Sequence, residues 1–444
     1  MPEVHVEVRL KDADAAECIT RAEIEDTFHS FLTNEYILPV RDGEQLRFEK
    51  FQHKDHVASV HVTGVNVESK DNAVFQFSDV QLEVHAYTLH EEAAAAFTVT
   101  FSTSKDSQAR LIDLPHESLA GVWERLKFDE TQNIKPEEIL NMAVHTVALL
   151  HQANNLPEAM NINRLILFHG PPGCGKSTLC RALAQKLVIR LSRIFRGGKL
   201  FEINTQDLLS KFYSESGKLI SEMFDKVIRM AHDDKELVCV LIDEIESIAT
   251  SRQASTKNGE CTDTVRATNQ LLTALDRIRR KPNVIVFCTS NLAESIDTAF
   301  LDRVYDVIPV PPPCASAVYT ILSSILNSLI DAGTIIYEPW GHTLPCDEDN
   351  ENFDFQKLGY YLDKSHLPSY ERLTVWTTAY PHSPGPVLKS VAEDCAGVSG
   401  RKLVKLPFLA ITKYTRQGKC TIFDAIQAIE KAVKLDKATN ESAE

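Results

Sequence analysis

The sequence lacks any hydrophobic run close to the roughly 18–20 residues that a membrane-spanning helix requires. Its first residues include no basic stretch followed by an apolar one, so no signal peptide is expected. Its ten cysteines are scattered, with no Cys-x-x-Cys pair and no histidine at zinc-finger spacing. These absences predict a soluble intracellular protein with reduced thiols and argue against the common cysteine-based zinc modules.

Positive charge is also scarce. The chain has 47 Lys and Arg residues against 62 Asp and Glu residues, which gives a formal net charge of −15. This balance disfavours a protein whose main task is to coat nucleic acid, because phosphate binding depends on clustered Lys and Arg. It leaves open a local basic groove. With 444 residues the chain is too long for one compact core, so two or three domains are expected.

Residues 1–110 are predicted to form a separate α+β domain. Apolar and polar residues alternate over 4–10 and 80–84, which is typical of half-buried strands. Between these stretches, apolar residues have helical spacing over 15–32. Because no catalytic constellation is present, the pattern indicates a recognition domain, joined to the rest of the chain by a polar linker at 102–110.

Residues 111–308 are predicted to form a large α/β domain. After a helical stretch at 136–151, short apolar runs alternate with helical segments, which indicates a parallel sheet with crossover helices. The apolar runs are 165–168, 200–203, 238–242 and 284–288, and the helical segments are 176–187, 216–232 and 264–279.

A group of prolines at 309–313 marks the end of this domain. Residues 309–436 are predicted to form a smaller, mainly helical domain. An irregular stretch at 331–386, with an acidic run and a group of prolines at 381, 384 and 386, is interpreted as an insertion. The last residues, 437–444, are expected to be a flexible tail.

A phosphate-binding loop stands between the first apolar run of the α/β domain and the helical segment that follows it. Its glycines allow backbone N–H groups to point at phosphate oxygens, at the positive end of the following helix. The lysine is expected to reach the β- and γ-phosphates of ATP, and the serine to bind Mg²⁺. A chance glycine-rich turn would not require this strand–loop–helix context. The predicted nucleotide-binding residues are Gly170, Pro171, Pro172, Gly173, Cys174, Gly175, Lys176, Ser177 and Thr178.

Cys174 in this loop has two interpretations. It is either a small residue that fits the loop, which we favour, or a redox-sensitive thiolate whose pKa is lowered by the helix N-terminus.

A second carboxylate site follows the apolar run 238–242. Asp243 is expected to join the nucleotide site and help to position Mg²⁺, and Glu244 to activate the attacking water. Apolar runs that end in an Asp-Glu pair are common, but here the pair follows a phosphate-binding loop within the same α/β pattern. The two motifs together predict an ATPase with ATP and Mg²⁺ as cofactors.

The apolar run 284–288 also ends in polar residues, of which Asn291 is the candidate for a catalytic role. An amide at this strand end can orient the water that attacks the γ-phosphate. Alternatively, Asn291 only caps a turn. The neighbouring motifs favour the first interpretation.

These motifs resemble the AAA+ ATPases, and residues 291–303 are similar to their second region of homology. Residues 211–218 resemble the AAA+ central-pore loop, in which Phe212 and Tyr213 would grip an extended polypeptide. Ser214 stands where that loop has a glycine, which leaves the flexibility of the loop open. The alternative is that both aromatic residues are buried in a core, which the polar residues on either side disfavour.

The resemblance is narrower still for six short segments, which are similar to the pachytene checkpoint protein 2 family: residues 164–169, 184–187, 190–192, 210–217, 397–401 and 406–408. The similarity is specific over about 110–435 and weaker before that. It implies that Arg401 is the second sensor of the γ-phosphate. It also implies that Arg303 is an arginine finger that reaches the nucleotide of a neighbouring subunit, where such a group stabilises transition-state charge.

The family resemblance implies a homo-hexamer that remodels HORMA-domain proteins, which are delivered in part by a HORMA-type adaptor that binds the N-terminal domain. It further implies roles in the spindle checkpoint and on meiotic chromosome axes, in the nucleus and cytoplasm. The main alternative is a nucleic-acid motor or loader with the same AAA+ core, against which the net charge and the pore-loop aromatics weigh. A third interpretation is an ATP-dependent switch or scaffold that moves nothing.

Overall fold

The computed structural model separates into two compact units, each of which is described by itself. The first comprises Met1–Glu124, Lys135–Gly170 and Lys176–Pro309, and the second comprises Arg125–Ile134, Pro171–Gly175 and Val310–Glu444. The structure describes residues 3–11, 20–64, 75–91, 109–126, 128, 135–152, 162–205, 216–249, 262–337, 366–373, 377, 383–415 and 420–441. Within these residues, every helix is too short or too polar to cross a membrane.

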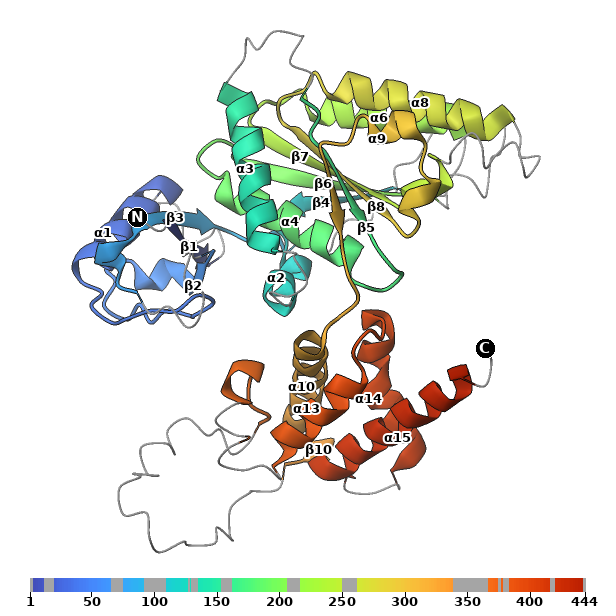
Figure 1. Ribbon diagram of the computed structural model, residues 1–444. Helices are drawn as coiled ribbons and strands as arrows, with labels where there is room; N and C mark the ends of the chain where they lie inside the picture. Colours follow the sequence, from blue (N-terminus) through green and yellow to red (C-terminus); the bar gives the residue numbers. More distant parts are fainter. Residues whose placement is uncertain are drawn as a thin grey trace, which may run out of the picture. The chain divides into compact units, whose positions relative to one another are not determined.

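The N-terminal part of the first unit is a three-stranded sheet covered by one helix (Figure 1). The central strand β1 (Glu3–Leu10) pairs antiparallel with β2 (Val57–Thr63) and parallel with β3 (Gln81–Tyr87). Helix α1 (Arg21–Asn34) packs on the face where Val4, Val6 and Val8 are buried. The alternation of apolar residues in the sequence therefore predicts β1 and β3 correctly, and the α+β prediction is confirmed.

Helix α1 begins later than the predicted segment 15–32, and residues 12–19 lie outside the described part of the chain. Thr20 caps its first turn: the Thr20 hydroxyl accepts a hydrogen bond from the backbone N–H of Glu23, and the Glu23 carboxylate accepts one from the backbone N–H of Thr20. Strand β2 was not predicted, because apolar and polar residues alternate only in its second half.

The main sheet of the first unit has six strands in the order β4-β6-β7-β8-β5-β9. Its strands are β4 (Ala109–Leu114), β5 (Leu165–His169), β6 (Gly197–Asn204), β7 (Glu236–Asp243), β8 (Val284–Ser290) and β9 (Asp306–Pro309). All neighbouring strands are parallel except β4, which pairs antiparallel with β6. The α/β prediction is confirmed, but β4 was not predicted, and its first two residues fall in the segment that the sequence indicates as a linker.

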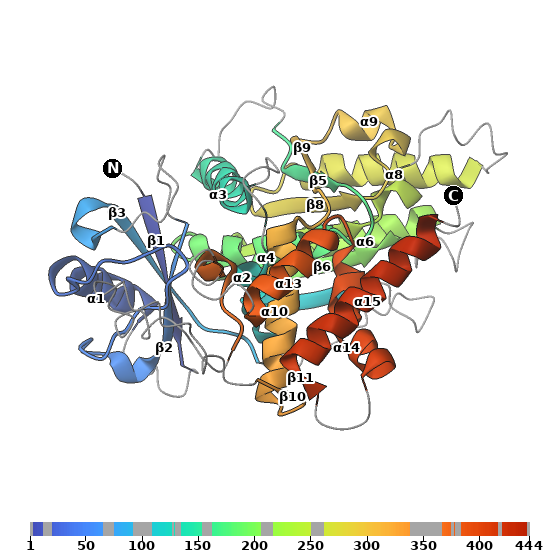
Figure 2. The same ribbon diagram turned by 60° about the horizontal axis from the view of Figure 1, so that its bottom comes forward.

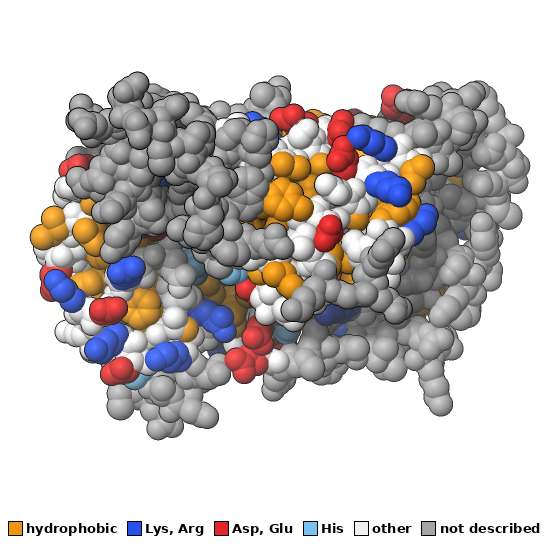
Figure 3. Space-filling view, turned by 90° about the horizontal axis from the view of Figure 1, so that it is seen from below, with side chains coloured by type: hydrophobic (Ala, Val, Ile, Leu, Met, Phe, Trp, Pro, Cys, Tyr) orange, Lys and Arg blue, Asp and Glu red, His pale blue; other side chains and the backbone are white. Residues whose placement is uncertain are grey.

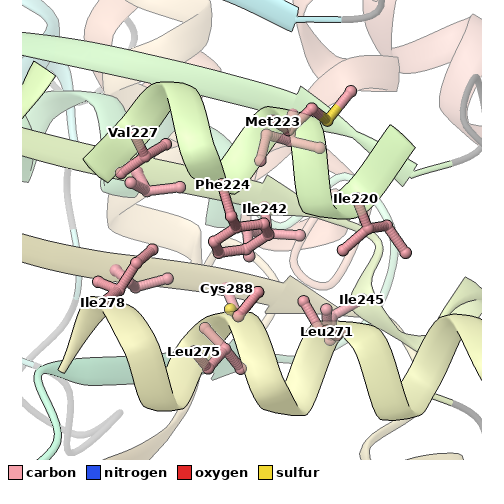
Figure 4. Packing of buried hydrophobic residues seen from close by; sticks show 14 of the residues in the cluster. Ile220, Met223, Phe224, Val227, Ile242, Ile245, Leu271, Leu275, Ile278 and Cys288 are labelled. Carbon is pink, nitrogen blue, oxygen red and sulfur yellow. The ribbon is translucent and has the colours of Figure 1, made fainter. Parts of the chain in front are cut away.

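Helices cover both faces of this sheet (Figure 1). The helices of the first unit that follow β4 in the chain are α2 (Val122–Arg125), α3 (Pro136–Gln152), α4 (Lys176–Arg190), α6 (Ser216–Met230), α8 (Thr262–Ile278) and α9 (Thr298–Leu301). Figure 4 shows Phe224 of α6 and Leu275 of α8 directed toward Ile242 of β7 and Cys288 of β8. Burial of these side chains holds α6 and α8 against the ends of the strands that carry the predicted catalytic residues.

A buried group of ion pairs joins the N-terminal sheet to helix α4. The Lys186 ammonium lies 2.6 Å from one Glu7 oxygen, and the Arg190 guanidinium lies 3.9 Å from the other and 3.2 Å from Glu137. Burial by itself raises the pKa of Glu7, but Lys186 and Arg190 outweigh this effect and lower it. Burial lowers the pKa of Lys186, whereas Glu7 and Glu124 raise it by more. Both partners are therefore charged in the folded state.

The second unit is a bundle of α10 (Ala315–Asp331), α13 (Pro384–Asp394), α14 (Gly400–Tyr414) and α15 (Ile422–Glu441) (Figure 2). A short parallel ladder, β10 (Ile335–Ile336) with β11 (Cys420–Thr421), lies at one end. The core includes Tyr319 and Leu322 of α10 and Ile426 and Ile429 of α15. The predicted helical lid is confirmed.

The predicted insertion at 331–386 lies mostly outside the described residues. Its described parts are the end of α10, β10, residues 366–373, residue 377 and the start of α13. Helix α15 continues to Glu441, into the segment predicted to be a tail, and 442–444 are not described. Single 3₁₀ turns lie at Lys54–His56, Phe77–Asp79, Glu117–Leu119, Ile245–Ser247, Ala293–Ser295 and Tyr370–Arg372.

Gly198 in β6 tests the packing of α4 on the sheet. A Cβ atom there would overlap the side chain of Val188 in α4 and lie 2.9 Å from the carbonyl oxygen of Leu237. Gly198→Ala is therefore expected to lower the free energy of unfolding by about 1–3 kcal/mol, measured by urea denaturation followed by circular dichroism. Gly197→Ala is the control, because the nearest atom to its Cβ would be 3.8 Å away. Equal midpoints for the two variants would contradict this account of the packing.

Candidate active site

The phosphate-binding loop connects β5 to α4, as the sequence predicts. Gly173 and Gly175 have φ angles of 78° and 101°, in the left-handed region that glycine adopts without strain. Helix α4 begins at Lys176, so its N-terminus, with unsatisfied backbone N–H groups, adjoins the loop. Pro171 and Pro172 are exposed, as is Thr178 in the first turn of α4, whereas the side chain of Cys174 is buried. A buried thiol fits the interpretation of Cys174 as a small loop residue.

Lys176 is buried and held beside the loop by two oxygens. Its Nζ atom donates to the carbonyl of Gly170 at 2.7 Å and to Oδ1 of Asn291 at 2.9 Å. Asn291 follows β8, which pairs in parallel with β5, and the backbone N–H of Gly170 donates to the carbonyl of Ser290 at 3.2 Å. The structure thus brings together two residues that are 115 positions apart and that the sequence assigns to one site.

The predicted metal ligands also lie together. The Ser177 hydroxyl donates to Oδ1 of Asp243 at 2.8 Å, and the hydroxyl of Thr289 donates to the same oxygen. Hydroxyl and carboxylate oxygens are hard ligands, of the kind that Mg²⁺ prefers. Ser177 and Asp243 therefore fit a Mg²⁺ site at the start of α4.

Glu244 has an unusual backbone. Its φ and ψ angles are 57° and 51°, and it is the one residue other than glycine with positive φ in the described part of the chain. Such conformations are disfavoured for residues with a side chain and persist where surrounding contacts enforce them. The buried hydroxyl of Thr205 donates to the carbonyls of both Asp243 and Glu244 at 2.8 Å, and the N–H of Glu244 donates to Thr289 at 3.2 Å. These contacts fix the direction in which Glu244 leaves β7.

Sequence reasoning missed three residues that shape this site: Thr205, Thr289 and Glu246. The carboxylate of Glu246 accepts a hydrogen bond from the backbone N–H of Asn291 at 3.0 Å, and so holds the turn after β8. Each of the three lies at or just after the end of a parallel strand. That position in the sequence could have identified them, because polar residues at these strand ends face the loop that follows β5.

The two predicted arginines have different surroundings. Arg303 forms a bidentate ion pair with Asp276, with both N···O distances at 2.9 Å, and also donates to the carbonyl of Ala299. This hydrogen bonding lowers the pKa of Asp276. Arg401 is exposed in the first turn of α14.

Within the second unit, the first turn of α14 contacts the phosphate-binding segment. The N–H of Gly400 donates to the carbonyl of Gly173 at 2.8 Å, and the Cβ atom of Arg401 lies 3.6 Å from where a side chain on Gly173 would begin. Arg401 thus starts beside the loop, and its assignment as a second sensor stays a prediction. Phe212 and Tyr213, the predicted pore-loop residues, lie outside the described part of the chain.

This combination of a phosphate-binding loop after β5, an asparagine after the adjacent strand β8 and an Asp-Glu pair at the end of β7 defines an ATPase of the AAA+ class. Residues 166–312 match the model of the ATPase family associated with various cellular activities (AAA). Residues 1–92 match the TRIP13 N-terminal domain, and residues 314–437 match the TRIP13-like AAA+ ATPase lid C-terminal domain. The chain belongs to the pachytene checkpoint protein 2 family.

Individual relatives agree with this assignment. The chain is 33% identical to the pachytene checkpoint protein 2 homologues of Mus musculus and Homo sapiens over 432 residues, which is 97% of this chain and 93% of each homologue. It is also similar to the solved structure of C. elegans PCH-2, with 26% identity, a TM-score of 0.70 and coverage of 99% of this chain and 100% of that one. The family resemblance inferred from the sequence is therefore confirmed.

Glu244→Gln tests the assignment of the water-activating residue. The variant is expected to bind ATP normally but to hydrolyse it about 10²–10⁴-fold more slowly, because the amide cannot accept a proton. Steady-state phosphate release and binding of a fluorescent ATP analogue measure the two effects. Lys176→Ala serves as the comparison, since it should lose nucleotide binding itself. Hydrolysis by Glu244→Gln at the wild-type rate would assign proton transfer to another group.

Proposed function

We propose that this ATPase uses hydrolysis to remodel HORMA-domain proteins, delivered in part by a HORMA-type adaptor. The observation that carries the proposal is the arrangement of the chain: an N-terminal domain and a lid of the TRIP13 type flank an ATP site that retains Glu244. By family membership, the proposal extends to the spindle checkpoint and meiotic chromosome axes, and to the nucleus and cytoplasm as locations.

The proposed chemistry assigns one role to each residue at the edge of the main sheet. Backbone N–H groups of the loop and the Lys176 ammonium bind the β- and γ-phosphates, and Ser177 and Asp243 hold Mg²⁺. The bound ion supplies neutralisation of phosphate charge. Glu244 takes a proton from the attacking water, and Asn291 orients that water.

In the same proposal, Arg303 and Arg401 report the state of the nucleotide. Arg401 lies at the start of α14 beside Gly173, so movement of the lid changes its access to the γ-phosphate. Arg303 acts on the nucleotide of a neighbouring subunit. To do so, its guanidinium must release Asp276 and bind a phosphate group instead.

A hexamer is proposed because a finger that acts on another subunit and a pore loop both require a ring. Helix α14 offers a surface for such contacts: Val404, Phe408 and Leu409 are 57%, 67% and 61% exposed. Figure 3 shows hydrophobic side chains exposed among Lys and Arg side chains on the face seen from below. Burying apolar side chains of this size against a second copy of the chain favours association.

Phe408→Ser is expected to weaken assembly by at least about 10-fold, because a large side chain no longer leaves water on association. Sedimentation velocity over a range of protein concentrations, with ATP present, measures the shift toward smaller species. Lys405→Ser on the same exposed side of α14 is the control. Identical behaviour of the two variants would place the subunit contact elsewhere.

The remodelling proposal is tested by the ATPase rate with a HORMA-domain protein and its adaptor, and with DNA in a parallel arm. The ATPase rate of the wild-type protein is expected to rise when the HORMA protein is present. The hydrogen exchange of the HORMA protein is expected to increase at the same time. Phe212→Ala should lose both effects, because the aromatic side chain that would contact the extended chain of the HORMA protein is removed.

The two alternatives give different results in this assay. Stimulation by DNA alone would indicate a nucleic-acid motor. Binding of the HORMA protein without any change in its hydrogen exchange would indicate an ATP-dependent switch or scaffold. Either result would overturn the proposed function.

A further inference from the structure

Two histidines and a glutamate converge on one face of the N-terminal sheet, away from the ATP site. His5 lies on β1, and Glu83 and His85 lie on the parallel neighbour β3, where His5 is paired in register with Glu83 (Figure 2). Because alternate residues of a strand share a face, these three side chains lie on the face opposite to the valine core. One ligand atom from each falls within 4.8 Å of the others.

The distances among the three ligand atoms are those expected when the atoms bind one small metal ion. Nδ1 of His5 lies 3.2 Å from Nε2 of His85, and these nitrogens lie 3.8 and 3.7 Å from Oε2 of Glu83. A point about 2.1 Å from all three atoms lies at the centre of this triangle, which is the bond length of zinc to imidazole and carboxylate. Two ligands of a tetrahedral zinc ion lie about 3.3 Å apart, so shifts of about 0.5 Å would complete that geometry around a fourth ligand.

We propose that His5, Glu83 and His85 form a binding site for a Zn²⁺ ion, which fastens β1 to β3 in the N-terminal domain. The proposal does not depend on ATP hydrolysis or on any protein substrate. Two imidazoles and one carboxylate, with water in the fourth position, are a ligand set that zinc accepts and that Mg²⁺ disfavours.

The surroundings keep both imidazoles in the form that binds metal. Burial, and secondly the charge of Arg190, lowers the pKa of His5 to about 2 and that of His85 to about 3. Burial thus favours the neutral ring at both positions, and the neutral imidazole is the form that binds metal. Nδ1 of His85 is buried without a hydrogen-bond partner in the described part of the chain, so Nε2 provides the polar contacts of that ring.

The two arginines whose charge lowers the pKa of His85 are each paired with carboxylates. Arg190 is paired with Glu137 and Glu7, and Arg193 lies 3.6 Å from Glu25. Glu3 lies 4.0 Å from Nε2 of His5, the nitrogen that faces away from the triangle.

The experiment uses the full-length protein, stripped with a chelator and titrated with Zn²⁺ against a chromophoric competitor. Excess Mg²⁺ is included to occupy the nucleotide site. Glu83→Gln is expected to lower the affinity of one site for zinc at least about 10-fold. His29→Gln, which alters a histidine of α1 outside the triangle, should bind zinc with the affinity of wild type. Visible absorption bands of tetrahedral Co²⁺, present in wild type and absent in Glu83→Gln, identify the same site.

A second measurement separates metal binding from damage to the fold. Glu83 is partly exposed, and glutamine has nearly the same shape, so the metal-free proteins should unfold at equal temperatures. Zinc should raise that temperature for wild type and His29→Gln but not for Glu83→Gln. Equal zinc affinity in all three proteins would overturn the proposal and leave the histidines as a hydrogen-bonded pair.

Discussion

The parallel register of four neighbouring strands is the constraint on which the ATP site depends. In the order β6, β7, β8 and β5, each strand ends at the same edge of the sheet. Asp243 and Thr289 lie in the last residues of β7 and β8, Thr205 follows β6, and the phosphate-binding loop follows β5. A slip of one residue in any pair would send a side chain to the opposite face. The hydrogen bonds among hydroxyls, Asp243 and the Glu244 backbone form only because these ends coincide.

The ion pairs between the N-terminal sheet and α4 have a different physical basis. Removing charges from water is costly, and the cost is offset only when each charge meets its partner with good geometry. Glu7 lies 2.6 Å from Lys186 and 3.9 Å from Arg190. These ion pairs form in only one position of the sheet on α4, so they specify how the sheet docks. An apolar interface would allow the sheet to shift along α4, whereas such a shift would separate the buried carboxylate from its two cations.

The sequence predicted the main sheet well, because buried parallel strands are continuous apolar runs bounded by loops. It also identified Lys176, Asp243 and Asn291 as members of one site, because each follows or precedes such a run. It could not predict β4, whose buried residues at 109, 112 and 114 follow no regular period. Thr205 and Thr289 escaped notice because a buried threonine differs little in sequence from a strand-forming one. The pairing of His5 with His85 depends on register across 80 residues, which no local pattern records.

Helix α4 has functional contacts at both ends. Its first turn carries Lys176 and Ser177, and its last turns carry Lys186 and Arg190, which hold the N-terminal sheet. Its 15 residues form a rod about 22 Å long, and twelve of them are buried, so the helix cannot bend without disturbing the core. It is therefore a rigid connection, within the first unit, between the first residues of the nucleotide site and the residues that hold the N-terminal sheet.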